Sequence, residues 1–583
     1  MKRLRGTDVV IIGAGWTGLL LARELTSRTG LNVVALERGP ARATADYRDD
    51  MDELDYGIRL GMMQAVADET VTFRHTVRDR ALPLRQHTSF YPGTGVGGGG
   101  EHWSAQAYRF LPDVFPILSK SREKYGDALI PDGHMLRDWP FSYGDLEPHY
   151  TRVDKLMGLS GKAGNLRGKI IDGGNIFEGP RSEEYPTPPT KQPYFGVLFR
   201  DAAAQLGYHP YPNPAATLSV PYTNPDGVAR GACAFCGYCD RFGCMIEAKA
   251  QPTNTLLPVL RKRKNFELRT GAWVRRIVTR DGRATGVEYT DLKGEEYFQP
   301  ADMVLLATFT MNNVRLLLLS KIGEPYAPES GRAALGSNLT HQVYFAAATV
   351  FMEQPLNRFM GAGAAGFTIS DFDGDLIDHS KQSFLRGGLL RVTPTGTRPI
   401  GNFGVLPPSV KATWGSDWKK ASVYWFDRVG QINFSGEHLP HRANFMDLDP
   451  TYKDKYGDPL LRFTLDWQDN DRKMASFITP KAVDIARAMG AKEILPFPGL
   501  KRYDTRRYQT THLQGGTVAG NSPDDSVLNG YSQHWQVPNL FVLGASAFPH
   551  NPGPNPTPTV LAMAYRTADA IVERYLKRPG LLV

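Results

Sequence analysis

All four cysteines of the 583-residue chain lie in one short segment, GACAFCGYCDRFGCMIEAKA, at positions 231–250. Cys233, Cys236, Cys239 and Cys244 follow the spacing C-x2-C-x2-C-x4-C. A structural zinc site normally uses two C-x-x-C pairs that a long stretch of chain separates, and no second pair follows in this sequence. Two disulfides closed within so few residues would be strained. Thiolates gathered around one point favour an iron–sulfur cluster, since ferredoxins use the similar run C-x2-C-x2-C-x3-C-P; zinc, disulfides and free thiols are the alternatives.

Near the N-terminus, three glycines have the spacing of a dinucleotide-binding motif. Gly13, Gly15 and Gly18 follow the apolar run 9–12, and a helix-forming segment and a second apolar run ending at Glu37 come next. In this G-x-G-x-x-G pattern the first glycine allows a tight turn, the second admits a pyrophosphate, and the third lets the helix pack on the strand. The acid can accept a hydrogen bond from a ribose hydroxyl, which disfavours a 2'-phosphate. The segment therefore predicts a site for FAD or NAD.

Three further segments distinguish between these cofactors. GTGVGGGGEHWS at 93–104 is a second glycine-rich run, and consecutive glycines suggest backbone lying against a flat ligand. NLFVLGAS at 539–546 is typical of a strand and a glycine turn, and NPTPT at 555–559 opens a terminal helix. Together these segments resemble the glucose–methanol–choline oxidoreductase family, whose members bind FAD. The alternative, an NAD-dependent Rossmann enzyme, leaves the second glycine run and the C-terminal strand unexplained.

The resemblance spans most of the chain and implies an α/β fold, in which a Rossmann-like FAD-binding domain carries a sheet-based substrate domain. GVGG at 95–98 matches the family's flavin-embracing loop, NLFVLGAS matches its second flavin contact, and GAWVRRIVTRDGRATGVEY matches its hairpin over the adenine. The FAD contacts that the match implies are Gly13, Gly15, Gly18, Glu37, Gly95, Gly97, Gly98, Trp103, Val274, Gly544 and Ala545.

One departure narrows the match. Where the family loop usually continues with two small hydroxyl residues and an asparagine, this chain has Gly99, Gly100 and, at the asparagine position, Trp103. GVGGGGEHWS, CAFCGYC, LDWQDNDRKM and GASAFPHNPG resemble a subgroup, the flavoprotein subunits of bacterial membrane-bound gluconate 2-dehydrogenases with the related 2-ketogluconate and sorbitol dehydrogenases. That resemblance implies a [3Fe-4S] cluster at 231–250, with [4Fe-4S] as the alternative. In a three-iron cluster one cysteine would not be a ligand.

An FAD alcohol dehydrogenase needs a base for the hydroxyl proton while the hydride leaves for the flavin. The resemblance places His512, in YQTTHLQGGTVAG, at the family's catalytic histidine and Asn555, in GPNPTPT, at the second catalytic position. An asparagine cannot act as the base, so His512 is expected to take the proton and Asn555 to hold the substrate oxygen. His550 and His102 also lie near motif glycines and are the alternative substrate contacts; a structural role in the core is the alternative for His512.

The flavin motifs lie at both ends and in the middle of the sequence, so the FAD-binding domain must be discontinuous. Residues 1–110, 205–335 and 500–583, including the cysteine segment, are assigned to this domain. Residues 111–204 and 336–499 are assigned to the substrate domain.

Composition is that of a globular protein, with 41% hydrophobic and 22% charged residues. The net charge of +8 is small for the length, and the basic residues are scattered, so nothing predicts nucleic-acid binding. No apolar stretch reaches the roughly 18 residues of a membrane span. The basic N-terminus imitates a secretory signal, but glycines and charges interrupt its apolar run, so we expect this segment to remain in the mature chain.

The motifs predict an FAD- and iron–sulfur-containing dehydrogenase, and the resemblance implies that it oxidises D-gluconate to 2-keto-D-gluconate. For the substrate, 2-keto-D-gluconate, sorbitol and glucose are the alternatives; for the class, a stand-alone flavin oxidase or a non-catalytic electron-transfer flavoprotein. A flavin and a cluster in one chain favour outward electron transfer over reaction with oxygen. The resemblance implies a small subunit carrying the export signal, a multihaem cytochrome c subunit, membrane association through a partner, and a location at the periplasmic face of the inner membrane.

Overall fold

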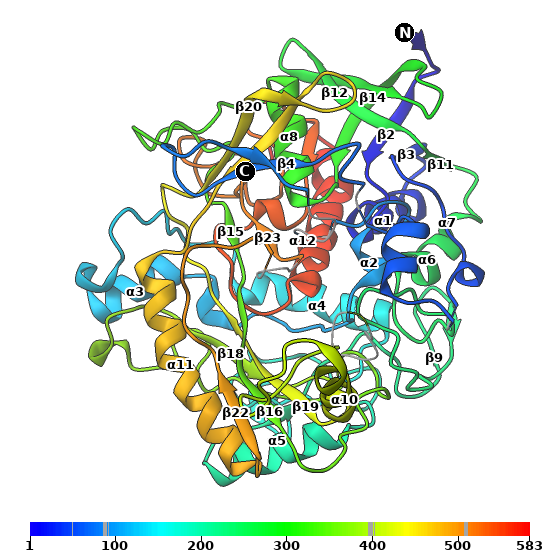
Figure 1. Ribbon diagram of the computed structural model, residues 1–583. Coiled ribbons are helices and arrows are strands. Elements are labelled where there is room, and N and C mark those ends of the chain that lie inside the picture. Colours follow the sequence, from blue (N-terminus) through cyan, green and yellow to red (C-terminus); the bar gives the residue numbers. More distant parts are fainter. Residues whose placement is uncertain are drawn as a thin grey trace.

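The computed structural model describes residues 1–48, 50–63, 65–85, 90, 92–394, 400, 403–506 and 511–583 of the chain. Two regions make up the molecule, and Figure 1 shows one above the other. The upper region contains the N-terminal strands, drawn in blue. The lower region contains a largely antiparallel sheet with helices beside it.

The upper region is built on a sheet of eight described strands. Its centre is parallel, since β2 lies between β3 and β14 with Val10 opposite both Val34 and Val304. The β2 side chains from Val9 to Ile12 are at most 3% exposed, because a β-branched run suits a strand covered on both faces. The strands are β1 (Lys2–Arg3), β2 (Thr7–Ile12), β3 (Val33–Glu37), β11 (Phe266–Thr270), β12 (Trp273–Arg280), β13 (Arg283–Thr290), β14 (Glu296–Leu306) and β24 (Leu540–Val542).

The lower region is a sheet of six described strands whose neighbours all pair antiparallel. The strands are β8 (Tyr211–Pro212), β16 (Val343–Phe351), β17 (Phe367–Ile369), β18 (Gly388–Arg391), β19 (Val429–Gly436) and β22 (Glu493–Pro496).

A separate four-stranded sheet consists of β4 (Val71–Arg74), β5 (Leu82–Pro83), β20 (Phe445–Lys453) and β21 (Pro459–Thr464). Short pairs are β6 (Asn165–Leu166) with β7 (Lys169–Ile170), β9 (Tyr222–Thr223) with β10 (Ala229–Arg230), and β15 (Thr340–His341) with β23 (Leu513–Gln514).

Helices cover these sheets, and the C-terminal helix α12, drawn in red, lies near the centre of Figure 1. The described helices are α1 (Trp16–Arg28), α2 (Gly99–His102), α3 (Ile117–Tyr125), α4 (Tyr143–Met157), α5 (Tyr194–Gln205), α6 (Pro252–Thr255), α7 (Leu257–Leu260), α8 (Thr310–Ser320), α10 (Gly415–Phe426), α11 (Asp469–Ala488) and α12 (Thr557–Ala570). None of them is long and apolar enough to cross a bilayer.

The domain boundaries stay a prediction, and two short strands cross them. β8 belongs to a segment assigned to the FAD-binding domain, yet it pairs with β17 of the lower sheet. β4 also comes from such a segment, and it pairs in parallel with β21, which falls in the predicted substrate domain. Strands are assigned to a sheet by their hydrogen-bonded neighbours in space, which motif positions along the sequence do not reveal.

Glu24 of α1 is a buried carboxylate that joins three helices. Its side chain is fully buried and pairs with the guanidinium groups of Arg23, Arg28 and Arg152. Arg152 belongs to α4 and also pairs with Asp569 of α12 at 2.8 Å. The carboxylate therefore holds α1, α4 and α12 together behind the junction of β2 and α1.

Replacing Glu24 by glutamine should lower the free energy of unfolding by about 1.5–3 kcal/mol, because this fully buried side chain then loses its charge-assisted hydrogen bonds to three arginines. Asp569→Asn is the matched control, since this carboxylate is 24% exposed and its loss should cost about 1 kcal/mol or less. Thermal and denaturant unfolding followed by circular dichroism measure both variants. Wild-type stability of Glu24→Gln would contradict this role.

Candidate active site

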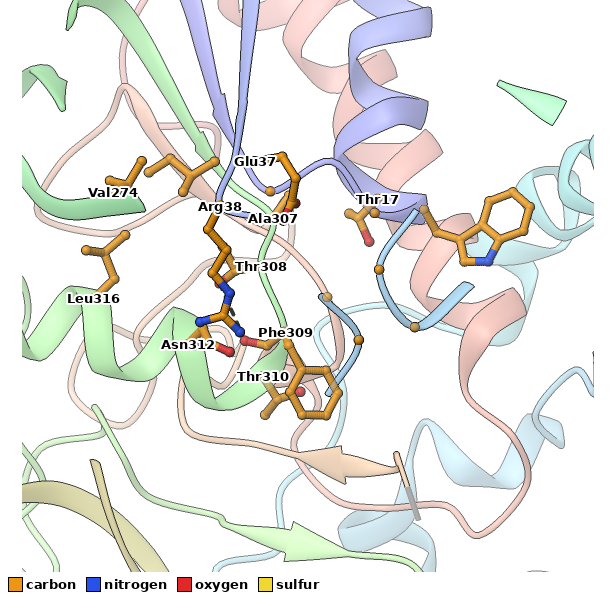
Figure 2. A pocket seen from close by; sticks show the side chains of 18 of the residues that line it. Thr17, Glu37, Arg38, Val274, Ala307, Thr308, Phe309, Thr310, Asn312 and Leu316 are labelled. Atoms are coloured by element: carbon orange, nitrogen blue, oxygen red, sulfur yellow. Dashed lines mark hydrogen bonds between the residues drawn. The ribbon is translucent and has the colours of Figure 1, made fainter. Parts of the chain in front are cut away.

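A cavity of about 270 Å³ opens at the carboxyl ends of the parallel strands in the upper region. Its walls are the ends of β2 and β3, the loop before α2, the start of β12, and the first turns of α1, α8 and α12. Figure 2 shows Thr17 of α1 on the right, Val274 and Leu316 on the left, and Glu37 between them. Open α/β sheets bind their ligands at this edge.

One wall of the cavity is a direct contact between two glycine segments. Gly15 and Gly97 form a parallel backbone bridge, and the Gly97 N–H donates to the carbonyl of Ala14 at 2.8 Å. Gly97 has a φ of 94°, and a Cβ there would lie 2.1 Å from Glu101 Oε1. Glycine alone suits this position, so the two backbones meet without a side chain between them.

The buried carboxylate of Glu101 fixes the second glycine segment. It accepts hydrogen bonds from the Tyr47 hydroxyl at 2.7 Å, from Gln251 Nε2 at 2.6 Å and from Thr253 Oγ1 at 2.9 Å. Burial raises the pKa of this carboxyl above its ordinary value. Sequence reasoning did not predict Glu101, although an acid directly after four consecutive glycines is a usable signal, because so flexible a loop needs an anchor.

The first turn of α1 faces the cavity without a side-chain cap. Gly15 precedes the helix and no acidic residue lies in its first turn, so the N–H groups there are left for an anion such as a phosphate. Gly13 has a φ of 97°, and a Cβ at Gly18 would lie 2.0 Å from the Gly13 carbonyl oxygen. Glu37 ends β3 and accepts two backbone N–H groups, at 3.1 and 2.9 Å.

His512 lines the cavity. Its Nδ1 lies 2.7 Å from Oε1 of Gln342; since this oxygen can only accept, Nδ1 carries the proton and Nε2 the lone pair. Burial lowers the pKa of His512 to about 3, and the positive charges of Arg391 and His341 act in the same direction. At neutral pH the imidazole is therefore uncharged, which is the state that can accept a proton.

Asn555 lies just behind the cavity lining, before the first turn of α12, and the two residues that follow it line the cavity. It is 8% exposed, and its Oδ1 accepts a hydrogen bond from Nη1 of Arg391 at 2.6 Å. Nearby, Asn551 Nδ2 donates to the carbonyl of His512 at 2.9 Å. The segments that carry the two predicted catalytic residues are therefore joined by hydrogen bonds.

The other predicted FAD contacts divide into two groups. Gly18 and Gly95 lie behind the lining, and a Cβ at Gly95 would lie 2.6 Å from the Pro40 carbonyl oxygen. His102 and His550, the alternative substrate contacts, are buried outside the described lining. The predicted FAD contacts that do line the cavity are Gly13, Gly15, Glu37, Gly97, Gly98, Trp103, Val274, Gly544 and Ala545.

Comparisons with known proteins agree with this geometry. A family model described as GMC oxidoreductase matches residues 440–564. The gluconate 2-dehydrogenase flavoprotein of Pantoea cypripedii is 44% identical over 594 aligned residues, which cover 100% of this chain and 96% of the relative. The chain belongs to the GMC oxidoreductase family.

A second relative and a solved structure extend the match. The fructose dehydrogenase large subunit of Gluconobacter japonicus is 25% identical, with 97% of both chains covered. The formate oxidase of Aspergillus oryzae RIB40, a solved structure, has a TM-score of 0.60 and 13% identity over 99% of both chains, which shows a shared fold. The expected α/β flavin fold is confirmed, and the chain is an FAD-dependent oxidoreductase.

Several residues that line the cavity of this GMC protein suit parts of FAD. The uncapped N-terminus of α1 suits the pyrophosphate, and Glu37 suits a ribose hydroxyl. Val274 at the start of β12 offers an apolar surface for the adenine. Ala545, the first turn of α12 and His512 also line the cavity, and they would hold the flavin ring.

The four cysteines lie outside the described cavity lining and form no disulfide. Cys239 and Cys244 are buried, and the other two are half-buried. Phe235 N–H donates to Cys233 Sγ at 3.3 Å, and Lys249 N–H donates to Cys244 Sγ at 3.5 Å. The residues that the structure describes contain no group of three or more His, Cys, Asp or Glu side chains arranged as metal ligands. Ligation of a cluster is therefore not shown.

Two buried cations accompany the cysteines, Arg230 directly before the segment and Lys249 within it, and the sequence reasoning missed both. Arg230 is 4% exposed; its Nη2 donates to the Met157 carbonyl, while Nε and Nη1 have no partner among the described residues. Buried positive charge and unpaired N–H groups fit an anionic group in this segment, such as thiolates bound to iron. Lys249 Nζ ties the segment to the α2 loop through the carbonyls of Glu101, Trp103, Cys239 and Phe242, at 2.7–3.0 Å.

Gly18→Ala should weaken FAD binding at least about tenfold and cost about 1–3 kcal/mol of stability, because the added methyl group forces α1 away from the Gly13 carbonyl. Gly30→Ala is the matched control, since a Cβ there would meet nothing within 4 Å. FAD content after gel filtration and the thermal midpoint report the two effects. Full FAD loading of Gly18→Ala at an unchanged midpoint would show that this close approach is not required.

Proposed function

We propose that the chain is the flavoprotein of a dehydrogenase that oxidises a hydroxyl group of a sugar acid, with D-gluconate as substrate and 2-keto-D-gluconate as product. The full-length identity of 44% to a relative named gluconate 2-dehydrogenase flavoprotein supports this substrate. One structural observation carries the chemistry: His512, with its Nδ1 proton held by Gln342, lies uncharged in the FAD cavity.

His512 acts as the base, and its Nε2 accepts the hydroxyl proton as the hydride leaves the carbon. Gln342 holds the tautomer that leaves the lone pair on Nε2. Asn555 uses its amide NH2 to hold the substrate oxygen, because its Oδ1 is already engaged by Arg391. Bound FAD supplies the hydride acceptor. The first turn of α12 has no side-chain cap, so its N–H groups stabilise negative charge that develops at this end of the cavity.

The proposal includes an iron–sulfur cluster at 231–250, of the [3Fe-4S] type in preference to [4Fe-4S]. The cysteine spacing supports it, as do the backbone N–H donors at two sulfurs and the buried cations Lys249 and Arg230. Such a cluster carries one electron at a time. The electron acceptor in this proposal is a partner protein and not oxygen.

The proposal also includes partner subunits. Two relatives are named as a flavoprotein and as a large subunit, and these names describe one member of an assembly. We propose a small subunit that carries the export signal and a multihaem cytochrome c subunit that accepts the electrons. Through these partners the chain would work at the periplasmic face of the inner membrane.

His512→Ala should keep its FAD but slow anaerobic flavin reduction by D-gluconate about 10²- to 10⁴-fold, which is the usual contribution of a positioned base. His209→Ala is the matched control, because this exposed histidine pairs with Asp371 away from the cavity. Stopped-flow absorbance of the flavin measures both variants. Reduction of His512→Ala at the rate of the control would place the base elsewhere.

The anaerobically purified chain should contain iron and acid-labile sulfide, and Cys239→Ser or Cys244→Ser should remove both. The FAD cavity lies elsewhere, so flavin reduction by D-gluconate should persist in both variants. Turnover with a haem protein as acceptor should collapse, because the cluster is the proposed exit for electrons. Zinc in the wild type, or full haem-linked turnover in an iron-free variant, would rule the cluster out.

A further inference from the structure

Arg391 is a buried cation beside the predicted catalytic pair. It ends β18, lies opposite Asn433 of β19 and is 4% exposed. One hydrogen bond of its guanidinium is seen, from Nη1 to Asn555 Oδ1 at 2.6 Å. Its other close neighbours are the rings of Tyr108 and Tyr344, with centroids at 5.9 and 5.7 Å.

The described residues place no carboxylate within ion-pair distance of Arg391. Two other buried arginines do have such partners, which shows one way in which this chain compensates a buried charge. Arg386 pairs with Asp113 and Glu437, and Arg109 pairs with Asp154. The faces of two aromatic rings recover only part of the cost of burying a guanidinium. An anion from outside the described residues would complete the site.

The position of Arg391 identifies that anion. It touches the side chain that holds the substrate oxygen in the proposed function, and its charge acts on His512 as well. Any anionic group it binds must therefore lie next to the carbon that is oxidised. We propose that Arg391 binds the carboxylate of the substrate, next to the hydroxyl-bearing carbon that is oxidised. This inference rests on the proposed function and adds to it the residue that recognises a 2-hydroxy acid.

The chemistry of the guanidinium agrees with this role. The guanidinium of Arg391 has five N–H groups, and one of them donates to Asn555. Donors therefore remain for a bidentate bond to a carboxylate. A polyol such as sorbitol brings no anion to the site. A sugar acid oxidised at a carbon far from its carboxylate would place its charge away from Arg391. A 2-hydroxy acid alone among these classes puts its hydroxyl at Asn555 and its carboxylate at Arg391 together.

The test compares D-gluconate with D-gluconamide, which has the same carbon chain but no charge, in anaerobic flavin reduction by the FAD-loaded protein. Arg391→Met should lower the efficiency of reduction by D-gluconate about 10²- to 10³-fold, mainly through weaker substrate binding. Its efficiency with D-gluconamide should change far less. Arg391→Lys keeps the positive charge but lacks the paired N–H donors of a guanidinium, so it should recover part of the lost efficiency with D-gluconate.

Two variants serve as controls. Arg200→Met removes a positive charge from an exposed position and should change neither substrate. Asn555→Ala should slow D-gluconate and D-gluconamide alike. If Arg391→Met loses efficiency of flavin reduction equally with D-gluconate and D-gluconamide, Arg391 only supports Asn555 and the proposal is overturned. A wild type that reduces its flavin equally well with both compounds would also overturn it.

A binding measurement separates this inference from the proposed function. Sodium acetate, with sodium chloride as the ionic-strength control, should perturb the oxidised flavin spectrum of the wild type but not of Arg391→Met. If neither D-gluconate nor D-gluconamide reduces the wild-type flavin, the proposed function fails while the acetate result still decides the role of Arg391. The inference is overturned if acetate changes the flavin spectrum of wild type and Arg391→Met equally. It is also overturned if acetate causes no spectral change in an Arg391→Lys variant that is folded and loaded with FAD.

Discussion

Two glycine segments meet backbone to backbone, and the rest of the active site depends on that contact. Gly15 at the start of α1 bridges Gly97 in the loop before α2, with no side chain between them. The contact requires a positive φ at Gly97, which glycine adopts freely, and a carboxylate, Glu101, that holds the loop from behind. Because backbone forms the wall, the cavity presents N–H groups to its ligand and excludes bulky side chains. The helices and sheets around it serve to hold these two segments at this distance.

The buried arginines among the described residues differ in how their charge is compensated. Arg109 and Arg386 each pair with buried carboxylates, as the cost of burying a charge requires. Arg230 and Arg391 do not, and they lie at the two places where the proposed chemistry brings in an anion. One of them stands beside the cysteine segment and the other beside Asn555. In both proposals a bound anion supplies the negative charge that these two arginines lack.

Sequence reasoning succeeded where function depends on local order along the chain. The run from β2 through Gly13, Gly15 and Gly18 to Glu37 was predictable, because each part of the motif has a task set by its immediate neighbours. His512 and Asn555 were placed by resemblance, and the structure finds them on segments joined through Asn551. The resemblance also gave the family and the fold class correctly.

The remaining features could not be predicted because their partners are remote in sequence. Lys249 reaches Glu101 and Trp103, and Arg391 reaches Asn555, across more than a hundred residues in each case. β8 joins the lower sheet although its neighbours in sequence belong to the FAD-binding segments. The spacing of the cysteines predicts that their thiolates surround one cluster, while no group of three or more described side chains is arranged as metal ligands. Their cluster remains a proposal.

The central claim is that this cavity brings a sugar acid to His512 beside FAD. An anaerobic titration of the FAD-loaded chain tests it most directly, with D-gluconate, 2-keto-D-gluconate, sorbitol and glucose added separately while the oxidised flavin absorbance is followed. The account predicts that D-gluconate bleaches the flavin completely and at the lowest concentration of the four. A flavin that stays oxidised with every one of them would contradict it, and so would preferential bleaching by sorbitol or glucose.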